Sequence, residues 1–144
     1  MTKVDPSKEE DLSWMVERLI DANLNRLKEG LRVIEDVCRY IHNDKVLTST
    51  IKEIRHSLQL AYKLERLLHR DIEADIQKQS TSSEQLREDI KDIIIANFSR
   101  SEESSRVLEE ILKLNNIKQS ERFKAIRYNL YSLEKEYFTK YLQS

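Results

Sequence analysis

The chain has 144 residues, of which 35% are charged and 39% are apolar, with one glycine and one proline. This composition is typical of long amphipathic helices and excludes a β-rich fold, which would need many more turn residues. A net charge of −1 argues against duplex nucleic acid as a partner, and the absence of a long apolar run argues against a membrane partner.

The first half of the chain predicts two helices. The first begins at Pro6, which suits the first turn of a helix, and ends near Ile41. The second is capped by Asp44 or Thr48, because short polar side chains satisfy free backbone N–H groups, and it ends near residues 69–71. We expect these two helices to form an antiparallel hairpin.

The second half predicts a matching pair of helices. After a long polar connection, Ser82-x-x-Gln85 is a capping-box pattern that is expected to start the third helix, which ends near Leu114. Ser120 is expected to open the fourth helix. Two packed hairpins predict an all-α four-helix bundle, with residues 1–144 as a single helical domain.

A sequence repeat links the two hairpins. Residues 22–36 return 74 positions later as residues 96–110, and seven of the fifteen positions are identical. A second echo, 72 positions apart, relates residues 52–58 to residues 124–130. Amphipathic helices share apolar spacing, but they do not ordinarily share the same Asn, Arg and Glu at the same phase, so we predict two pseudo-symmetric hairpins. The internal repeat is expected to cover about residues 15–70 and 84–142.

Each copy of the repeat places an asparagine in its apolar stripe. Steps of 100° per residue put Asn23 in the middle of the core-facing residues of its helix, and Asn97 takes the same place in the second copy. A buried amide without partners costs about 1–3 kcal/mol, so each asparagine needs partners. Two roles stay open, because the asparagines could read a ligand or could fix the register of the helices.

Three serines in the second copy replace Leu27, Gly30 and Leu31 of the first copy. Such a face forms either a polar recess or a close approach between two helices. If a single cluster binds a ligand, this face favours the second copy. The serines are Ser101, Ser104 and Ser105.

Four arginines are expected to converge between the hairpins, because they flank the two asparagines or lie beside the core faces of the second and fourth helices. They are Arg26, Arg55, Arg100 and Arg127. The other charged residues of the repeat are equally well explained as solvated salt bridges, worth about 0.2–1 kcal/mol each. These are Glu29, Arg32, Glu35, Glu103, Arg106 and Glu109.

Several chemical motifs are missing from the chain. It has no glycine-rich phosphate loop, no paired cysteines and no histidine spacing that would bind a metal. A phosphate group would therefore be held by arginine side chains. Asp71 and Asp75 could supply carboxylates for Mg²⁺, or they could lie in a solvated linker.

The chain is expected to be a cytoplasmic protein. Cys38 is its one cysteine, so it forms no internal disulfide and fits a reducing compartment. The polar, acidic N-terminus does not resemble a signal peptide.

The repeat region also resembles a known family. It is similar, over about residues 15–140, to the helical domain that precedes the synthase barrel in some bacterial thiamine-phosphate synthases. That domain is regarded as an alternative hydroxymethylpyrimidine-phosphate kinase, which supplies the pyrimidine pyrophosphate that the synthase joins to the thiazole. The blocks that carry the resemblance are residues 20–36, 54–56, 70–71, 96–100 and 106–110.

The resemblance implies a protein of thiamine biosynthesis that phosphorylates or binds hydroxymethylpyrimidine phosphate, with ATP and Mg²⁺ as cofactors if it is a kinase. Asp71 and Asp75 are then the expected catalytic and metal-binding residues. Gln77 stands where such domains tend to carry a glycine, and this exchange can remove a backbone contact to phosphate. Taken with the repeat, the expected substrate- and phosphate-binding residues are Asn23, Arg26, Arg32, Arg55, Asn97, Arg100, Ser101, Ser104, Arg106 and Arg127.

A second hypothesis is a non-catalytic helical module. In this case the buried polar clusters fix the register of the bundle, while the surface docks a separate thiamine-phosphate synthase or a second copy of the chain as a homodimer. The expected partners are thus a small phosphorylated pyrimidine, a synthase, or both.

Overall fold

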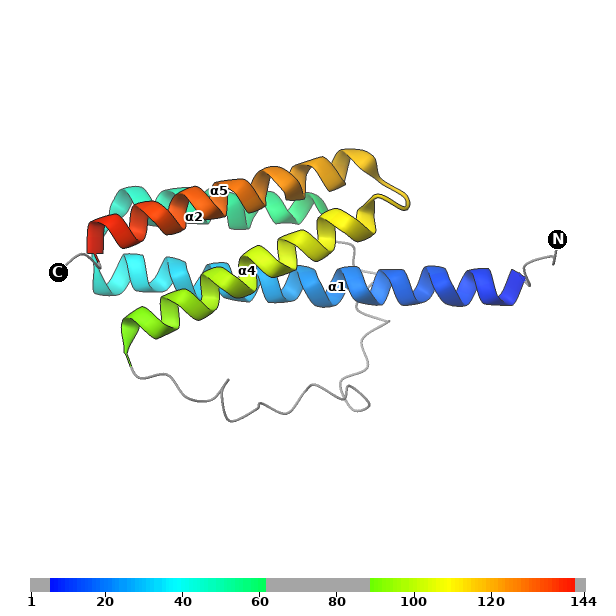
Figure 1. The fold of residues 1–144 in the computed structure, drawn as a ribbon, viewed down its shortest axis with the longest axis horizontal. Helices are drawn as coiled ribbons and strands as arrows, with labels where there is room; N and C mark the ends of the chain where they lie inside the picture. Colours follow the sequence, from blue (N-terminus) through cyan, green and yellow to red (C-terminus); the bar gives the residue numbers. More distant parts are fainter. Residues whose placement is uncertain (1–5, 62–88, 142–144) are drawn as a thin grey trace.

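The computed structural model describes residues 6–61 and 89–141, and within these ranges the chain forms four α-helices and no strand (Figure 1). A short π-helix, η1 (Val37–Ile41), continues the first α-helix, and a short 3₁₀-helix, η2 (Leu58–Ala61), continues the second. None of the described helices is long and apolar enough to cross a membrane. The predicted all-α helical bundle is confirmed. The α-helices are α1 (Pro6–Asp36), α2 (Lys45–Ser57), α4 (Ile90–Leu112) and α5 (Ile117–Tyr141).

The turn between α1 and α2 is built by two short polar residues. Asn43 has a φ of 52°, in the left-handed region that asparagine tolerates better than most residues. Asp44 has extended backbone geometry, and its Oδ1 accepts a hydrogen bond of 2.9 Å from the backbone N–H of Leu47. Asp44 is therefore the cap of α2, and Thr48 is not. The expected end of this helix near residues 69–71 lies outside the described residues.

The second hairpin begins and turns at residues other than the predicted ones. Asp89, with φ −152° and ψ 179°, caps α4 by accepting a 2.9 Å hydrogen bond from the backbone N–H of Asp92, so α4 starts at Ile90. The Ser82-x-x-Gln85 pattern lies outside the described residues and is not the cap of this helix. Asn116 Oδ1 accepts a hydrogen bond of 3.1 Å from the backbone N–H of Gln119, in the first turn of α5, so Asn116 caps this helix. The prediction that Ser120 opens this helix was wrong.

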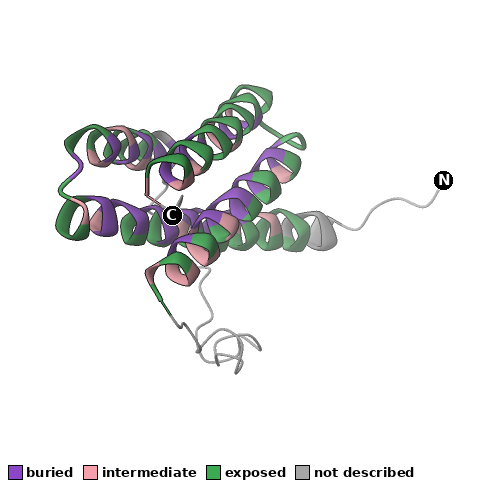
Figure 2. Cartoon of the chain, turned by 60° about the vertical axis from the view of Figure 1, so that its left-hand side comes forward, coloured by how far each residue is buried: buried purple, intermediate pink, exposed green. Residues whose placement is uncertain are grey.

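The bundle core lies where the four helices face one another. In Figure 1, α1 runs antiparallel to both α2 and α4 and packs against each of them, and α5 packs antiparallel on α4. Figure 2 shows the buried residues on the inward faces of all four helices and the exposed residues on the outer faces. The first turns of α1 extend beyond the other described helices, and large apolar side chains there, such as Trp14 and Met15, are exposed.

The backbones of α1 and α4 approach each other closely at Gly30. A Cβ atom placed on Gly30 would lie 2.4 Å from Ser101 Oγ and 3.2 Å from the backbone oxygen of Asn97. Ser101, Ser104 and Ser105 are all buried. Of the two roles that the serine face left open, the structure therefore shows the close approach of two helices.

The C-terminal end of α5 is attached to the turn between α1 and α2. The buried Asp44 accepts hydrogen bonds from Lys140 Nζ at 2.6 Å and from the hydroxyl of Tyr141. His42 stacks on Tyr141 at a ring distance of 3.8 Å and shares a 2.6 Å hydrogen bond with the hydroxyl of Tyr137. Burial opposes the ionisation of Asp44, but the hydrogen bonds from Lys140, Tyr141 and the Leu47 amide outweigh it and hold its pKa well below the ordinary value.

Candidate functional site

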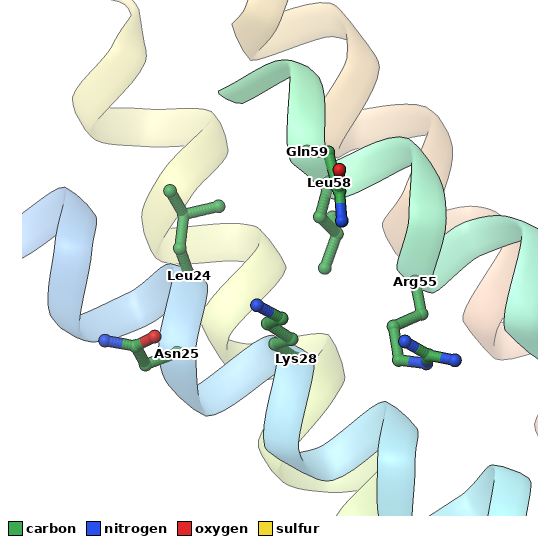
Figure 3. Close-up of a pocket in the computed structure, with 6 residues that line it drawn as sticks. All are labelled: Leu24, Asn25, Lys28, Arg55, Leu58 and Gln59. Atoms are coloured by element: carbon green, nitrogen blue, oxygen red, sulfur yellow. The ribbon is translucent and has the colours of Figure 1, made fainter. Parts of the chain in front are cut away.

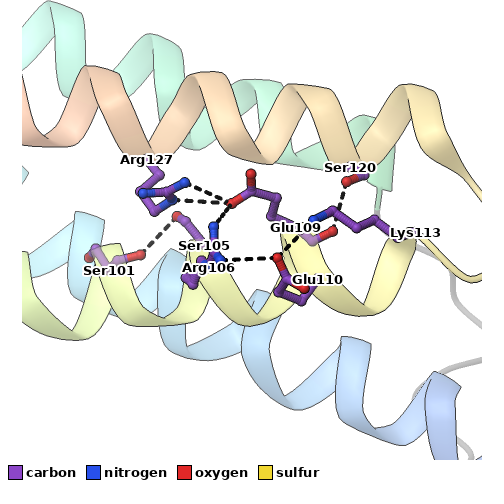
Figure 4. Close-up of polar contacts among 8 residues, drawn as sticks. All are labelled: Ser101, Ser105, Arg106, Glu109, Glu110, Lys113, Ser120 and Arg127. Carbon is purple, nitrogen blue, oxygen red and sulfur yellow. Dashed lines mark hydrogen bonds and ion pairs between the residues drawn. The ribbon is translucent and has the colours of Figure 1, made fainter.

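Two of the predicted arginines form buried ion pairs between helices. Arg55 of α2 reaches Glu35 on α1, with Nε to Oε2 at 2.8 Å and Nη2 to Oε1 at 3.3 Å. Arg127 of α5 reaches Glu109 on α4, with its Nε and Nη2 at 3.2 Å and 3.0 Å from Oε2 (Figure 4). Both glutamates are buried, so each arginine neutralises a carboxylate within its own hairpin.

Two further arginines lie at the edge of these pairs. Arg32 is 3.7 Å from a carboxylate oxygen of Glu35, and Arg106 is 3.2 Å from Glu109. Both arginine side chains are more than half exposed, and they also form ion pairs with Asp36 and Glu110, the acidic residues that follow Glu35 and Glu109. The arginine side of each pair is solvated, as helical spacing predicts, but the prediction that Glu35 and Glu109 are solvated as well was wrong, because both carboxylates are buried.

The two asparagines bond within their own helices. Asn23 Nδ2 donates to the backbone oxygen of Leu19 at 2.9 Å, and Asn97 Nδ2 donates to that of Ile93 at 2.8 Å. Asn23 is buried, as its place in the apolar stripe predicts, and Asn97 is partly exposed. The donor side of each amide is thus satisfied by a carbonyl four residues earlier, which meets the need for a partner without a ligand.

The remaining predicted residues do not gather with these groups. Arg26 and Arg100 are exposed, and neither makes an ion pair with another residue in the described ranges. Ser101 and Ser104 are buried, with Ser101 in the contact between α1 and α4. Asp71 and Asp75 lie outside the described residues, and among the described side chains no group of three His, Cys, Asp or Glu could hold a metal ion.

A cavity between α1 and the end of α2 forms the first groove. It has a volume of about 340 Å³, and among the described residues of its lining Arg55 is the one that was predicted as a site residue. Figure 3 shows Lys28 and Leu24 on α1 facing Arg55, Leu58 and Gln59, with the Lys28 amino group extending into the space between the helices. The groove combines two cationic side chains, polar amides and two leucines. Its lining is Leu24, Asn25, Lys28, Arg55, Leu58 and Gln59.

A cavity between α4 and α5 forms the second groove, with a volume of about 430 Å³. At the offsets of the repeat, three of its six lining residues correspond to residues of the first groove: Ser99 to Asn25 and Glu102 to Lys28 after 74 positions, and Tyr131 to Gln59 after 72. The exchange of Lys28 for Glu102 replaces a cationic side chain by a carboxyl group. The lining is Ser99, Glu102, Glu103, Arg106, Val107 and Tyr131.

Glu102 in the second groove is a carboxyl group that holds its proton. It is 9% exposed, and its Oε2 is buried without a hydrogen-bond donor among the described residues. Burial, the negative charge of Glu134 and its hydrogen bond with Glu102, and the negative charge of Glu103 raise the pKa of Glu102 to about 8. Burial also raises the pKa of Glu134. At neutral pH the Glu102 side chain is therefore mainly an uncharged carboxylic acid.

Comparison with known proteins shows which family this helical chain belongs to. A sequence profile of the ThiD2 family matches residues 18–136. The chain belongs to the ThiD2 family. No solved structure matches it.

Curated relatives of the chain are thiamine-phosphate synthases. It is 39% identical to the enzyme of Nostoc sp. PCC 7120 over 133 residues, which is 91% of this chain and 38% of the relative. It is 38% identical to the enzyme of Synechocystis sp. PCC 6803 over 120 residues, 83% of this chain and 35% of the relative. For the enzyme of Rhodopirellula baltica, the identity is 36% over 129 residues, 86% of this chain and 34% of the relative. The chain thus spans little more than a third of the length of these relatives, and it resembles a thiamine-phosphate synthase-related helical domain.

Proposed function

We propose that this chain binds hydroxymethylpyrimidine phosphate in the first groove and transfers a second phosphoryl group to it, to provide the pyrimidine pyrophosphate used in thiamine-phosphate synthesis. The observation that supports this proposal is the first groove itself, where Lys28 and Arg55 lie beside the apolar side chains of Leu24 and Leu58. Its volume of about 340 Å³ falls in the range of small-molecule sites. Similarity to thiamine-phosphate synthases supports the choice of pyrimidine.

The donors of the groove suit a phosphate group. An arginine has five N–H donors, and within the described residues Glu35 takes two of those of Arg55, so this part of the chain leaves three for a ligand. Lys28 adds a positive charge, and charge-assisted hydrogen bonds to phosphate are about twice as strong as neutral ones. The leucines would contact the ring, and the amides of Asn25 and Gln59 would bond its polar atoms.

ATP and Mg²⁺ are the cofactors that a kinase reaction implies. The described residues do not supply a magnesium site, and the one glycine, Gly30, is packed against α4 instead of forming a phosphate loop. The carboxylates proposed for the metal are those of Asp71 and Asp75, outside the described residues. The proposal for the described part of the chain is therefore limited to holding and orienting the pyrimidine phosphate.

Isothermal titration calorimetry with hydroxymethylpyrimidine phosphate tests the binding step. A charged hydrogen bond is worth about 1.5–3 kcal/mol, so Lys28→Ala is expected to weaken binding about tenfold to a hundredfold. Lys124→Ala removes an exposed lysine on α5 that does not line the groove and is the matched control. Equal affinity of the Lys28→Ala variant and the wild type would contradict the assignment of the groove.

Phosphorus NMR of the same mixture with ATP and Mg²⁺ tests the transfer step. A new pyrophosphate doublet pair and the signals of ADP are expected. Tight binding without these signals would remove the kinase and leave a module that binds the pyrimidine phosphate for a synthase.

A further inference from the structure

We propose that the outer face of α5 is the contact surface of a homodimer, in which α5 of a second copy of this chain packs antiparallel on it with the two-fold axis at Tyr128. Four exposed residues define this α5 face, namely Glu121, Tyr128, Tyr131 and Lys135. None of the four is among the described residues that line the first groove, so the inference is independent of the proposed phosphate site.

Two exposed tyrosines lie at the middle of α5. Tyr128 is 54% exposed and Tyr131 is 42% exposed. Their rings lie edge to face with centroids 6.0 Å apart, and the guanidinium carbon of Arg127 lies 4.9 Å and 5.8 Å from the two centroids. Because Arg127 is itself held by Glu109, the rings rest on a fixed side chain before any partner binds. Tyrosines that lose little freedom on binding are typical of the centres of protein interfaces.

Two charged residues flank these tyrosines on the same face. Glu121 lies seven residues before Tyr128 and Lys135 lies seven residues after it, and a step of seven residues returns almost to the same side of a helix. At a rise of 1.5 Å per residue, each charge is about 10 Å along the helix from Tyr128. Within the described ranges, neither residue forms an ion pair with another side chain. The α5 face therefore has an aromatic centre with opposite charges at equal distances on its two sides.

This pattern is complementary to itself. In two antiparallel helices related by a two-fold axis, a residue that precedes the axis lies opposite the partner's residue that follows it by the same number of positions. An axis at Tyr128 therefore places Glu121 opposite Lys135 of the partner subunit, and Lys135 opposite Glu121 of the partner subunit. A parallel pair of α5 helices would instead oppose two glutamates and two lysines, so the charges select the antiparallel arrangement.

The antiparallel arrangement gives the dimer an aromatic centre and a charged rim. Tyr128 meets Tyr128 of the partner subunit on the axis, Tyr131 of each copy lies beside this pair, and the two ion pairs lie at the ends. Aromatic residues at the centre and charges at the rim are the usual anatomy of a specific interface. Because exposed ion pairs contribute little affinity and mainly fix the register, we expect a weak dimer with a Kd of roughly 1–100 μM.

Sedimentation-velocity ultracentrifugation over a concentration series tests the dimer. The chain is expected to pass from monomer to dimer between roughly 1 μM and 1 mM. Tyr128→Ala removes the ring on the axis and is expected to weaken the dimer by at least about tenfold. Tyr40→Ala, at a tyrosine of η1 that is 67% exposed and lies outside the α5 face, is the matched control and is expected to dimerise as the wild type does.

An exchange of charges tests the register. Glu121→Lys and Lys135→Glu each oppose like charges at both ends of the interface, and each is expected to weaken the dimer by at least about fivefold. The double variant Glu121→Lys/Lys135→Glu restores both ion pairs with their signs exchanged, so its Kd is expected to lie within about threefold of the wild type. Lys52→Glu makes the same change of charge at an exposed site on α2 and is expected to leave the dimer unchanged. Circular dichroism verifies that every variant is folded.

A chain that sediments as a monomer at every concentration would overturn the inference. A dimer that Tyr128→Ala does not weaken would do the same, as would a double charge variant that dimerises no better than the single ones. A monomer that forms a complex with a thiamine-phosphate synthase, lost in Tyr128→Ala, would assign the α5 face to that partner and show that the homodimer is wrong. Each of these results leaves the phosphate proposal standing, because Lys28→Ala tests that proposal separately.

Discussion

Glu35 and Glu109 each use their charge to hold two helices together. Each carboxylate is buried, and each is neutralised by one arginine from the next helix of its hairpin. A buried carboxylate that loses its ion-pair partner destabilises the folded state, because it is no longer hydrated by water and has no charge to compensate for that. Arg55 and Arg127 therefore stabilise the fold whether or not a ligand is bound.

Replacing Arg127 by methionine tests this role. The variant leaves Glu109 buried without its main partner, so we expect the free energy of unfolding to fall by about 3–5 kcal/mol in urea titrations. Arg106→Met, at a side chain that is 54% exposed, is the control and is expected to cost less than about 1 kcal/mol. Equal losses in the two variants would contradict the account.

Glu102 predicts a pH dependence of stability. Its pKa is about 8 in the folded chain and 4.5 for an ordinary glutamate, so the folded chain holds a proton that the unfolded chain releases between these values. The contribution of Glu102 to stability is therefore fully present below about pH 4.5 and is lost as the pH rises through 8. Glu103 and Glu134 carry the charges that face it.

Differential scanning calorimetry from pH 5 to pH 9 measures this effect. Relative to Glu102→Gln, which cannot ionise, the Tm of the wild type is expected to fall progressively across this range. Parallel curves for the two proteins would show that Glu102 ionises normally. Glu121→Gln, at an exposed site on α5, is the control and is expected to follow the wild type.

At the scale of the elements, the contact between α1 and α4 depends on small residues. Gly30→Ala would place a Cβ atom 2.4 Å from Ser101 Oγ. Overpacking costs about 1–3 kcal/mol, while alanine gains up to about 1 kcal/mol in helix propensity, so we expect a net loss of stability. Chemical denaturation measures it.

The double variant Gly30→Ala/Ser101→Ala provides the second half of this test. Without the Oγ atom, the nearest Ser101 atom would be the Cβ at 3.7 Å, an ordinary contact. The double variant is therefore expected to be more stable than Gly30→Ala alone. A loss that is the same with and without Ser101→Ala would place the strain elsewhere.

The helices themselves could be predicted from their periodicity, but several of their ends could not. Asp44 was one of two expected caps, whereas Asn116 was passed over for Ser120 because both are good capping residues in the same polar turn. Ser120 instead donates its hydroxyl to the backbone oxygen of Glu109 at 2.7 Å. Such a bond depends on how α4 and α5 pack, which local sequence does not specify.

The candidate site was predicted only in part, for the same reason. Asn23 was correctly placed in the core, because one helix determines its face. Lys28 and Gln59 were not predicted as site residues, because the first groove arises only where α1 meets the end of α2. The one available signal was the repeat itself, because Lys28 and Glu102 take the same position in its two copies and differ in chemistry.

At the scale of the whole molecule, the two hairpins present related grooves with different chemistry. The ion pair of Glu35 with Arg55 has a counterpart in the ion pair of Glu109 with Arg127, so each hairpin is held together by a similar interhelical contact. The groove of the first hairpin is cationic, and that of the second contains a protonated carboxyl group.

The most direct test of the phosphate site is an NMR titration of the ¹⁵N-labelled chain with hydroxymethylpyrimidine phosphate. The account predicts that the largest shifts occur at Asn25, Lys28 and Gln59, and that they saturate with the calorimetric Kd. Shifts confined to residues away from the first groove, or no saturable shifts, would contradict it.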